Sequence, residues 1–311
     1  MMNKKFVTRL LIFTIILIAA DRLIGLTFNK LYFTSNDKSI AKLRYTIDST
    51  RQDIIILGSS RAQHHFNPSV IAKETGLSAY NCGFGGQGLA FSFVQLSEMT
   101  KRYHPKLVIL EVSPEILLDP ESEDKLRILL PYANRDTLIR NILTRNNPLE
   151  NVKLLSEIYP YNSKIINLLK ALSQKPSDPY NGYYPLDRQI DTTQKIVINS
   201  FKTSNGIAED KFYYLDRISN LCNEKNIPLF ITISPYYSVN QDLMNLNDQI
   251  ASRCELNRLN FENYSSYPET YHKPMLFQDN AHLNDTGADL FSSAISKKIS
   301  LYFSNDYSAS L

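Results

Sequence analysis

The sequence predicts an α/β fold, a three-layer sandwich in which about five parallel strands lie between two layers of helices. Three short apolar runs support this prediction, at residues 54–57, 107–112 and 228–233. Each run is followed by a glycine or a serine, and an uninterrupted apolar run such as residues 54–57 is typical of strands buried on both faces. Helical segments separate the runs, and this alternation indicates the crossover connections of a parallel sheet.

The chain begins with a basic segment that leads into a mostly apolar run. Residues 6–20 form the run, Arg9 interrupts it, and Arg22 lies shortly after its end. If the two arginines reach toward opposite interfaces, residues 6–28 are long enough to span a bilayer, since a helix needs about 20 residues to do so. We therefore expect a membrane anchor over residues 1–28. A cleaved secretory signal and a helix of a soluble protein are the alternatives, and the weak cleavage pattern favours the anchor.

The basic start also predicts an orientation. Under the positive-inside bias the N-terminal lysines and Arg9 stay in the cytoplasm, so that the chain after residue 28 lies outside it. Residues 29–311 suffice for a single α/β domain with a sizeable core and one insertion. We expect a helical insertion at about residues 119–200, where apolar strand runs give way to helical and Tyr/Asn/Pro-rich segments. We interpret it as a cap on the ligand-binding edge of the sheet.

Composition argues against several classes of partner and cofactor. The net charge is only +3 and both signs are interspersed, so nothing indicates binding of nucleic acid. The three cysteines, Cys82, Cys222 and Cys254, are too few for a disulfide scaffold, and their spacing matches no zinc pattern. The sequence offers no ligand cluster for another metal. We therefore expect neither a metal nor an organic cofactor.

A small turn follows the first predicted strand. The strand ends at Gly58, and Ser59 and Ser60 come directly after it. A small residue at the carboxyl end of a buried strand lets the next side chain stand at the open edge of the sheet, where ligands bind in α/β folds. Ser60 is therefore a candidate nucleophile. The alternative is that both serines serve only to cap the next helix.

Near the C-terminus, Asp279 and His282 are separated by two residues in a polar turn that opens a helix. A carboxylate three positions before a histidine can hold the imidazole through one ring nitrogen. The other nitrogen is then free to take a proton from a hydroxyl group, which is the division of labour in a Ser-His-Asp triad. Ser60, His282 and Asp279 therefore form a candidate triad whose members come from opposite ends of the chain.

Four glycines stand close together between residues 83 and 88, after a short predicted strand. No Gly-Lys-Ser/Thr ending follows them, and no acidic residue stands at the spacing of a dinucleotide-binding unit, so nucleotide binding is weakly supported. A simpler interpretation is that the backbone here needs positive φ angles and brings an N–H group near the serine.

Together these motifs resemble the SGNH (GDSL-like) hydrolases, and among them membrane-anchored envelope members such as DltD-like proteins and alginate-acetylation-type acyltransferases. The family's first block corresponds to Gly58-Ser59-Ser60, and its Asn-x-x-x-x-Gly block to the segment from Asn81 to Gly86. Its last block corresponds to Asp279 and His282. The resemblance implies a flavodoxin-like fold, with Ser60 as nucleophile, His282 as base and Asp279 as the group that orients it. It also implies an oxyanion hole formed by the N–H groups of Ser60 and Gly86.

The family's remaining block, Gly-x-Asn-Asp, is missing. The matching strand, residues 107–112, runs into Ser113, and no asparagine follows to donate to an oxyanion. Losing one such donor typically raises the barrier by about 2.7 to 4 kcal/mol unless another group replaces it. The candidates for that replacement or for binding a substrate carboxylate or phosphate are Ser113, Arg61, His64 and His65, and His65 is preferred among the three that follow the serine turn. A surface or capping role is the alternative for Arg61, His64 and His65.

The resemblance and the expected anchor together predict an extracytoplasmic protein of a bacterial cell envelope. It would be a serine esterase or an O-acyltransferase that acts on ester-linked acyl groups, above all acetyl groups, of an envelope polysaccharide. A membrane-bound acyltransferase is a candidate partner. The alternative from a different class is a non-catalytic binding or assembly protein of such a pathway. The missing asparagine favours that alternative, and the retained triad opposes it.

Overall fold

The computed structural model describes residues 4–117, 126–145, 147–175, 177–178, 180–193 and 212–309. The chain forms two compact units. The first contains Met1–Arg44 and Ser122–Ser177, and the second contains Tyr45–Glu121 and Asp178–Leu311. The helix α2 (Lys38–Asp48) contains the boundary between them. Each unit is therefore discontinuous in the sequence.

This division differs from the expected boundaries, which placed the whole insertion in the sheet domain. Residues 122–177 instead belong with the N-terminal helix. The physical reason is that the inserted segment satisfies a polar group of that helix. The Asp21 carboxylate accepts hydrogen bonds from the Ser156 hydroxyl at 2.5 Å and from the Glu157 N–H at 2.9 Å. The insertion from Asp178 onward belongs to the second unit, and its parts at 119–125 and 194–200 lie outside the described residues.

The second unit is built on a five-stranded sheet in the order β2-β1-β3-β4-β5, and every neighbouring pair is parallel. This is the flavodoxin-like order, in which the winding reverses between β1 and β3, and ligands of open α/β sheets generally bind outside the carboxyl ends of the strands at such a point. The prediction of about five parallel strands is confirmed. The strands are β1 (Ile54–Leu57), β2 (Ala79–Asn81), β3 (Leu107–Glu111), β4 (Leu229–Ile233) and β5 (Asn260–Asn263).

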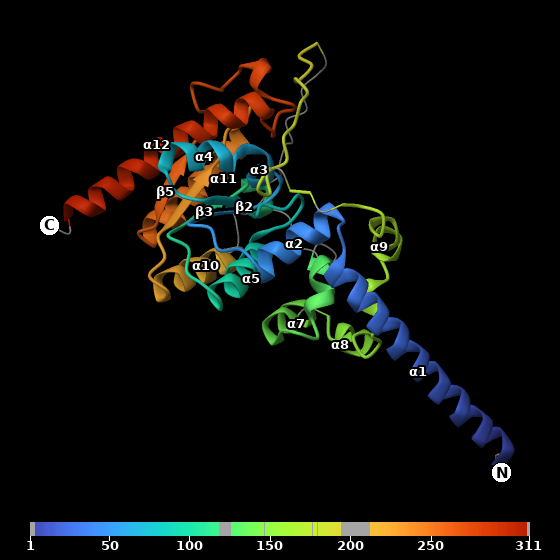
Figure 1. Cartoon of the computed structure of the whole chain (residues 1–311). Helices are drawn as coiled ribbons and strands as arrows, with labels where there is room; N and C mark the ends of the chain where they lie inside the picture. The colour runs from blue at the N-terminus through green and yellow to red at the C-terminus, as the bar shows by residue number, and fades with distance from the viewer. Residues whose placement is uncertain are drawn as a thin grey trace. The chain divides into compact units, whose positions relative to one another are not determined.

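Helices cover both faces of this sheet, as the three-layer prediction requires (Figure 1). On one face α4 (Pro68–Thr75) packs against α12 (Asp285–Ala309), and on the other α5 (Leu89–Thr100) packs against α10 (Tyr213–Glu224). The helix α11 (Gln241–Leu256) contacts α10 through an ion pair of 2.5 Å between Arg253 and Asp216.

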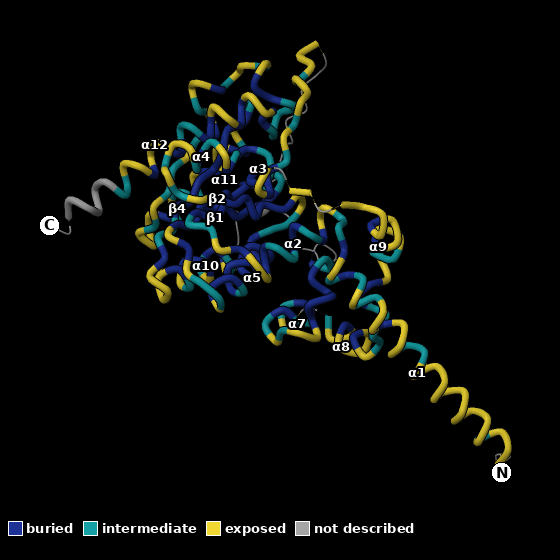
Figure 2. The backbone as a smooth tube through the Cα atoms, in the orientation of Figure 1, coloured by how far each residue is buried: buried dark blue, intermediate teal, exposed yellow. Residues whose placement is uncertain are grey.

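The strands β1 and β3 are buried along their whole length, and the centre of the sheet is dark blue in Figure 2. In one core cluster Ile54 and Ile56 of β1 and Ile109 of β3 pack with Phe66 and Phe291. Burying side chains of this size contributes roughly 1.5–3 kcal/mol each relative to leaving them exposed. The strands therefore form a rigid base for the loops at their carboxyl ends.

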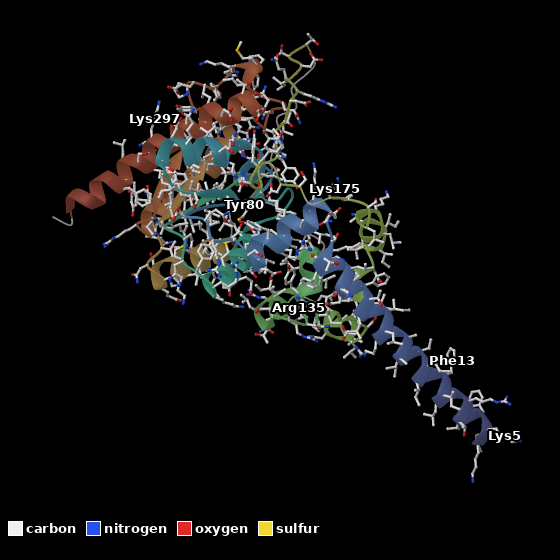
Figure 3. All side chains as sticks on the ribbon, in the orientation of Figure 1. Lys5, Phe13, Tyr80, Arg135, Lys175 and Lys297 are labelled. Carbon is white, nitrogen blue, oxygen red and sulfur yellow. The ribbon has the colours of Figure 1, made fainter. Side chains whose placement is uncertain are left out.

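The first unit begins with α1 (Lys4–Thr34), a single helix of 31 residues. In the part of the chain that the structure describes, α1 is the one helix long and apolar enough to cross a membrane. Its N-terminal part is exposed (Figure 2), and Phe13 projects outward from it (Figure 3). A helix satisfies its interior backbone groups within itself, as a spanning segment must. The apolar run is thus a candidate membrane anchor or signal sequence.

Short helices of the inserted segment surround the C-terminal part of α1. Tyr32 and Phe33 meet the ring of Tyr132 edge-on at centroid distances of 6.3 and 5.2 Å. The Tyr161 hydroxyl accepts a hydrogen bond from the Asn29 side chain at 2.8 Å. These contacts hold one end of α1 inside the unit. The short elements are η2 (Arg127–Tyr132), α7 (Thr137–Thr144), α8 (Leu149–Lys153), η3 (Tyr159–Tyr161) and α9 (Ile165–Ala171).

Candidate active site

The turn after β1 places Ser60 at the carboxyl edge of the sheet. Gly58 has a φ of +139°, and a Cβ at this position would lie 2.6 Å from the carbonyl oxygen of Glu111, so only glycine fits. Ser59 then caps the short helix α3 (Ser60–His65) by accepting a hydrogen bond from the Arg61 N–H. Ser60 is the first residue of α3, and its side chain is free of the capping role that Ser59 performs.

A second turn carries Asp279 and His282. One carboxylate oxygen of Asp279 accepts hydrogen bonds from the N–H groups of Ala281 and His282, at 2.8 and 2.9 Å. These bonds close the Asp-x-x-His segment into a compact loop just before α12. The two carboxylate oxygens lie 3.0 and 2.9 Å from Nδ1 of His282. On the other side of the ring, Nε2 lies 2.9 Å from the Ser60 hydroxyl.

The hydrogen bonds decide where the imidazole proton lies. Burial raises the pKa of the Asp279 carboxyl, but hydrogen bonds from His282 and from the neighbouring backbone N–H groups outweigh it, so the pKa is lower than 3.8. The ionised carboxylate only accepts, so Nδ1 carries the proton of the neutral ring. Nε2 is then an acceptor that faces the Ser60 hydroxyl. The three side chains are thus arranged to move a proton away from Ser60.

The glycine loop lies beside Ser60. A Cβ on Gly85 would stand 3.8 Å from the Cβ of Ser60. Gly86 has a φ of +73°, which glycine adopts without strain, and the turn closes through a bond of 3.1 Å from the Gln87 N–H to the Phe84 carbonyl. The positive φ expected in this segment is therefore present. The segment that carries the expected oxyanion donor, Gly86, thus runs next to the nucleophile candidate.

Asn81, the first residue of the glycine block, supports the serine helix from behind. Its side-chain amide donates to the carbonyls of Ala62 and Phe66 at 2.7 and 2.8 Å, and its carbonyl oxygen accepts from the Gly83 N–H at 2.9 Å. A further tie runs from the Gly85 N–H to the side chain of Gln63 on α3, at 2.9 Å. The glycine loop and α3 are thereby locked together.

Arg61 lies in the interior, only 3% exposed, and faces away from solvent. Its Nε donates to Glu111 at 3.0 Å, its terminal nitrogen donates to the hydroxyl and carbonyl of Ser234, and the guanidinium stacks 3.4 Å from the centre of the Tyr236 ring. Burial acts to lower the pKa of Arg61, but Tyr236 and the carboxylates of Glu111 and Glu115 outweigh it, so the pKa is raised. These contacts fit a supporting role behind Ser60 better than the expected substrate contact.

Ser113 is also committed to this buried network. Its hydroxyl donates to Glu111 at 2.9 Å and lies 2.8 Å from the hydroxyl of Ser59. A hydroxyl group has one proton, so Ser59 is the donor in the second bond. Ser113 therefore has no proton left for an oxyanion, which argues against its expected role as replacement donor.

His65 is fully buried and braces the loop of the candidate triad. Its Nε2 accepts a hydrogen bond of 3.0 Å from the N–H of Leu283, the residue after His282. Burial, and next the positive charge of Arg61, hold the pKa of His65 well below 6.5, so the ring is neutral. This position does not suit the expected contact with a charged substrate group. His64 is nearer to the site, since its ring meets the His282 ring edge-on at 5.7 Å.

Two residues with clear structural roles were not identified from the sequence. Glu111 links Arg61, Ser113 and Ser234, and Gln63 links α3 to the glycine loop. A signal for Glu111 existed, because it is the one charged residue at the end of an otherwise apolar buried strand. Among the described residues, no three His, Cys, Asp or Glu side chains gather where they could hold a metal ion.

Replacing Glu111 tests the buried network. Glu111→Ala is expected to destabilise the protein by about 3–5 kcal/mol, because it leaves the Arg61 charge buried without its partner. Urea unfolding of the full chain in detergent, followed by circular dichroism, measures the change. Glu262→Ala is the matched control, since Glu262 pairs with Lys298 at an exposed site and such pairs contribute about 0–1 kcal/mol. Equal stability of the two variants would show that the buried pair is not a support.

No protein-family model matches the chain, and no curated protein matches it. Among solved structures it is similar to a protein assigned as an acylhydrolase from Bacteroides fragilis, at 13% identity and a TM-score of 0.43 over 83% of this chain and 94% of the other. A GDSL-like lipase from Bacteroides thetaiotaomicron is similar at 12% identity and a TM-score of 0.43, over 85% and 97%. An acetyl xylan esterase is similar at 12% identity and a TM-score of 0.39, over 79% and 97%.

Proposed function

We propose that this chain is a membrane-anchored serine acylhydrolase of the SGNH type. The observation that carries the proposal is the unbroken line of hydrogen bonds from the Ser60 hydroxyl through His282 to Asp279. Such a line is how serine hydrolases activate a hydroxyl that is a weak nucleophile on its own. The position of Ser60 at the carboxyl edge of a parallel sheet adds support, because substrates reach α/β enzymes at that edge.

The reaction would proceed through an acyl-enzyme. His282 Nε2 takes the proton of Ser60, and Oγ attacks the ester carbonyl carbon, whose π electrons move to the oxygen. The N–H groups of Ser60 and Gly86 are the proposed donors to that oxyanion. When the intermediate collapses, the C–O bond to the leaving alcohol breaks and the protonated His282 donates its proton to the departing oxygen. Water or a sugar hydroxyl then attacks the acyl-enzyme in the same way.

The proposed substrate is an ester-linked acyl group, above all acetyl, on a bacterial envelope polysaccharide. The candidate anchor α1 supports this, since an anchored domain outside the cytoplasm works close to envelope polymers. With water as acceptor the protein is an esterase, and with a sugar hydroxyl it is an O-acyltransferase. A membrane-bound acyltransferase is the proposed partner for the second case.

A second candidate function is binding or assembly without catalysis. The observation that favours it is that Ser113, at the place of the missing asparagine, uses its proton on Glu111. A site with fewer oxyanion donors is a poorer catalyst, by about 2.7 to 4 kcal/mol for one donor.

Labelling with a fluorophosphonate probe separates the two functions. The full chain in detergent is expected to gain one probe at Ser60, because an activated serine attacks phosphorus as it attacks an ester carbonyl. Intact-mass measurement and peptide mapping detect the adduct, and Ser60→Ala and His282→Ala should both remain unlabelled. A folded parent protein that takes up no probe would favour the binding function.

A further inference from the structure

The helix α8 in the first unit carries its apolar side chains on the outside. Leu149 and Val152 of α8, and Leu155 in the turn directly after it, are 65%, 62% and 65% exposed and are spaced three residues apart, so they lie along one side. On the other side Glu150 and Leu154 are buried. Exposed side chains of this size differ from the pattern expected for a helix that faces water, where the apolar side packs inward. The exposed side of α8 therefore suits an apolar environment.

Contacts of the segment just after α8 hold the end of this helix beside a defined part of α1. Just after α8, the carbonyl of Leu155 accepts a hydrogen bond of 3.0 Å from Arg22, and Glu157 pairs with the same guanidinium at 2.8 Å. Gly25 of α1 lies against Glu157 so closely that a Cβ on Gly25 would stand 2.3 Å from the Glu157 Cβ. The end of α8 is thus held beside residues 21–25 of α1, in agreement with its place in Figure 1.

That level matches the boundary of a bilayer. The exposed apolar side chains of α1 begin at Phe6, and a helix rises 1.5 Å per residue, so a hydrocarbon core of about 30 Å would extend from Phe6 to Leu26. Residues 21–25, which hold the end of α8, then lie within about 8 Å of the far boundary. Helices that lie on a membrane bury their apolar side to about 5–10 Å, at the border of headgroups and acyl chains.

A cationic cavity adjoins this apolar surface. It is an open hollow of about 470 Å³ whose lining includes Arg22, Arg135 and Arg140 together with Leu155, the exposed residue in the turn after α8. Two carboxylates, Asp136 and Glu157, line it against three guanidinium groups, so the lining keeps a positive charge. Basic side chains next to an apolar surface complement the anionic headgroups and acyl chains of a bilayer.

We propose that α8 is a membrane-surface helix, whose exposed side enters the headgroup–acyl boundary of an anionic lipid bilayer while the arginine-lined cavity binds lipid phosphate groups. The proposal rests on the proposed anchoring by α1. A second attachment beside the spanning helix restricts how the first unit tilts on the membrane. The bilayer is the proposed occupant because contacts with Arg22 and Gly25 hold the end of α8 at the level where the exposed apolar side chains of α1 end.

Tryptophan quenching tests this, since the chain contains no tryptophan of its own. Val152→Trp would be made in the full chain and reconstituted into vesicles whose lipids are brominated either near the headgroup end or near the methyl end of the acyl chains. We expect strong quenching by the shallow bromines and weaker quenching by the deep ones. Leu149→Trp should repeat the result, which guards against a folding defect in one variant.

Two further variants make the outcomes distinguishable. Ile16→Trp, in the apolar part of α1, should be quenched most by the deep bromines, and Leu256→Trp, 73% exposed on α11, supplies the reference for an exposed leucine outside the first unit. If Val152→Trp is quenched no more than Leu256→Trp while Ile16→Trp is quenched, the α8 proposal is wrong and the anchor stands. If the emission of Val152→Trp is shifted to the blue without quenching, another protein surface covers α8. The α8 proposal is then also wrong, and the anchor stands. An unquenched Ile16→Trp would refute the anchor and the proposal together.

The lipid headgroup is tested separately. Quenching of Val152→Trp should be stronger in vesicles that contain phosphatidylglycerol than in pure phosphatidylcholine, and Arg140→Gln should remove the difference. Inorganic phosphate added to the buffer should not compete, because the proposed ligand is presented by the membrane. Equal quenching in both vesicle types would show that the cavity does not bind lipid headgroups, and loss of the difference with free phosphate would show that its ligand is a soluble phosphate and not a headgroup.

Discussion

Ser60→Ala is expected to lower kcat for ester hydrolysis by about 10⁴-fold or more, because the variant has no hydroxyl that His282 can deprotonate. Hydrolysis of p-nitrophenyl acetate by the full chain in detergent gives the rate. The residual rate would come from the backbone N–H groups that still stabilise an oxyanion when water attacks directly.

Ser59→Ala is the matched control for this prediction. It removes the neighbouring hydroxyl, which caps α3 and bonds to Ser113. Loss of such a cap typically destabilises a protein by about 1 kcal/mol, so activity should fall far less than in Ser60→Ala. If the two variants lose activity equally, Ser60 acts as a helix-starting residue and not as a nucleophile.

Asp279→Asn is expected to lower kcat by about 10⁴-fold with the fold intact. An amide can donate as well as accept, so it no longer forces the proton of His282 onto Nδ1. The ring can then turn or carry its proton on Nε2, which leaves no acceptor opposite the Ser60 hydroxyl at 2.9 Å. The kinetic constants of the variant and of the parent, measured side by side, provide the test.

The pH dependence of this loss follows from the pKa of Asp279, which lies below 3.8. Because folding lowers this pKa, the ionised carboxylate contributes stability above pH 3.8 that is lost as the pH falls through the folded-state pKa. Asp279 therefore keeps its charge at neutral and alkaline pH, and the loss of kcat should be the same throughout that range. Asp289→Asn is the control, since an asparagine keeps the oxygen that accepts from Asn67 at 2.7 Å. Equal effects of the two substitutions would exclude an orienting role for Asp279.

The residues at the end of β3 have a structural role, where the missing asparagine would have donated to an oxyanion. Glu111 and Ser113 occupy that place, and they bind Arg61 and Ser59 behind the serine turn. Arg61 and His65, which follow Ser60 by one and five residues, point into the same interior. The polar groups near Ser60 thus serve to hold the turn, and Gly86 is left as the proposed partner of the Ser60 N–H.

The sequence by itself determined the central strands and the pairing of motifs at the two ends of the chain. Strand β1 is a continuous apolar run and β3 and β4 are mostly apolar, and a buried strand is recognised from that local pattern. Ser60 and Asp279–His282 could be singled out because each lies in a short segment whose neighbours, Gly58 above all, already dictate the turn.

Only the tertiary structure decided which side chains face each other across long separations. The partner of Arg61 lies 50 residues away in Glu111, and Glu157, which packs on α1, lies 135 residues after its partner Arg22. Neither contact leaves a periodic trace in the sequence, because a buried ion pair and a helix contact through Gly25 depend on where the folded backbone brings single residues together. Local patterns record which surfaces of an element are apolar, whereas the choice of partner is made by packing of the whole chain.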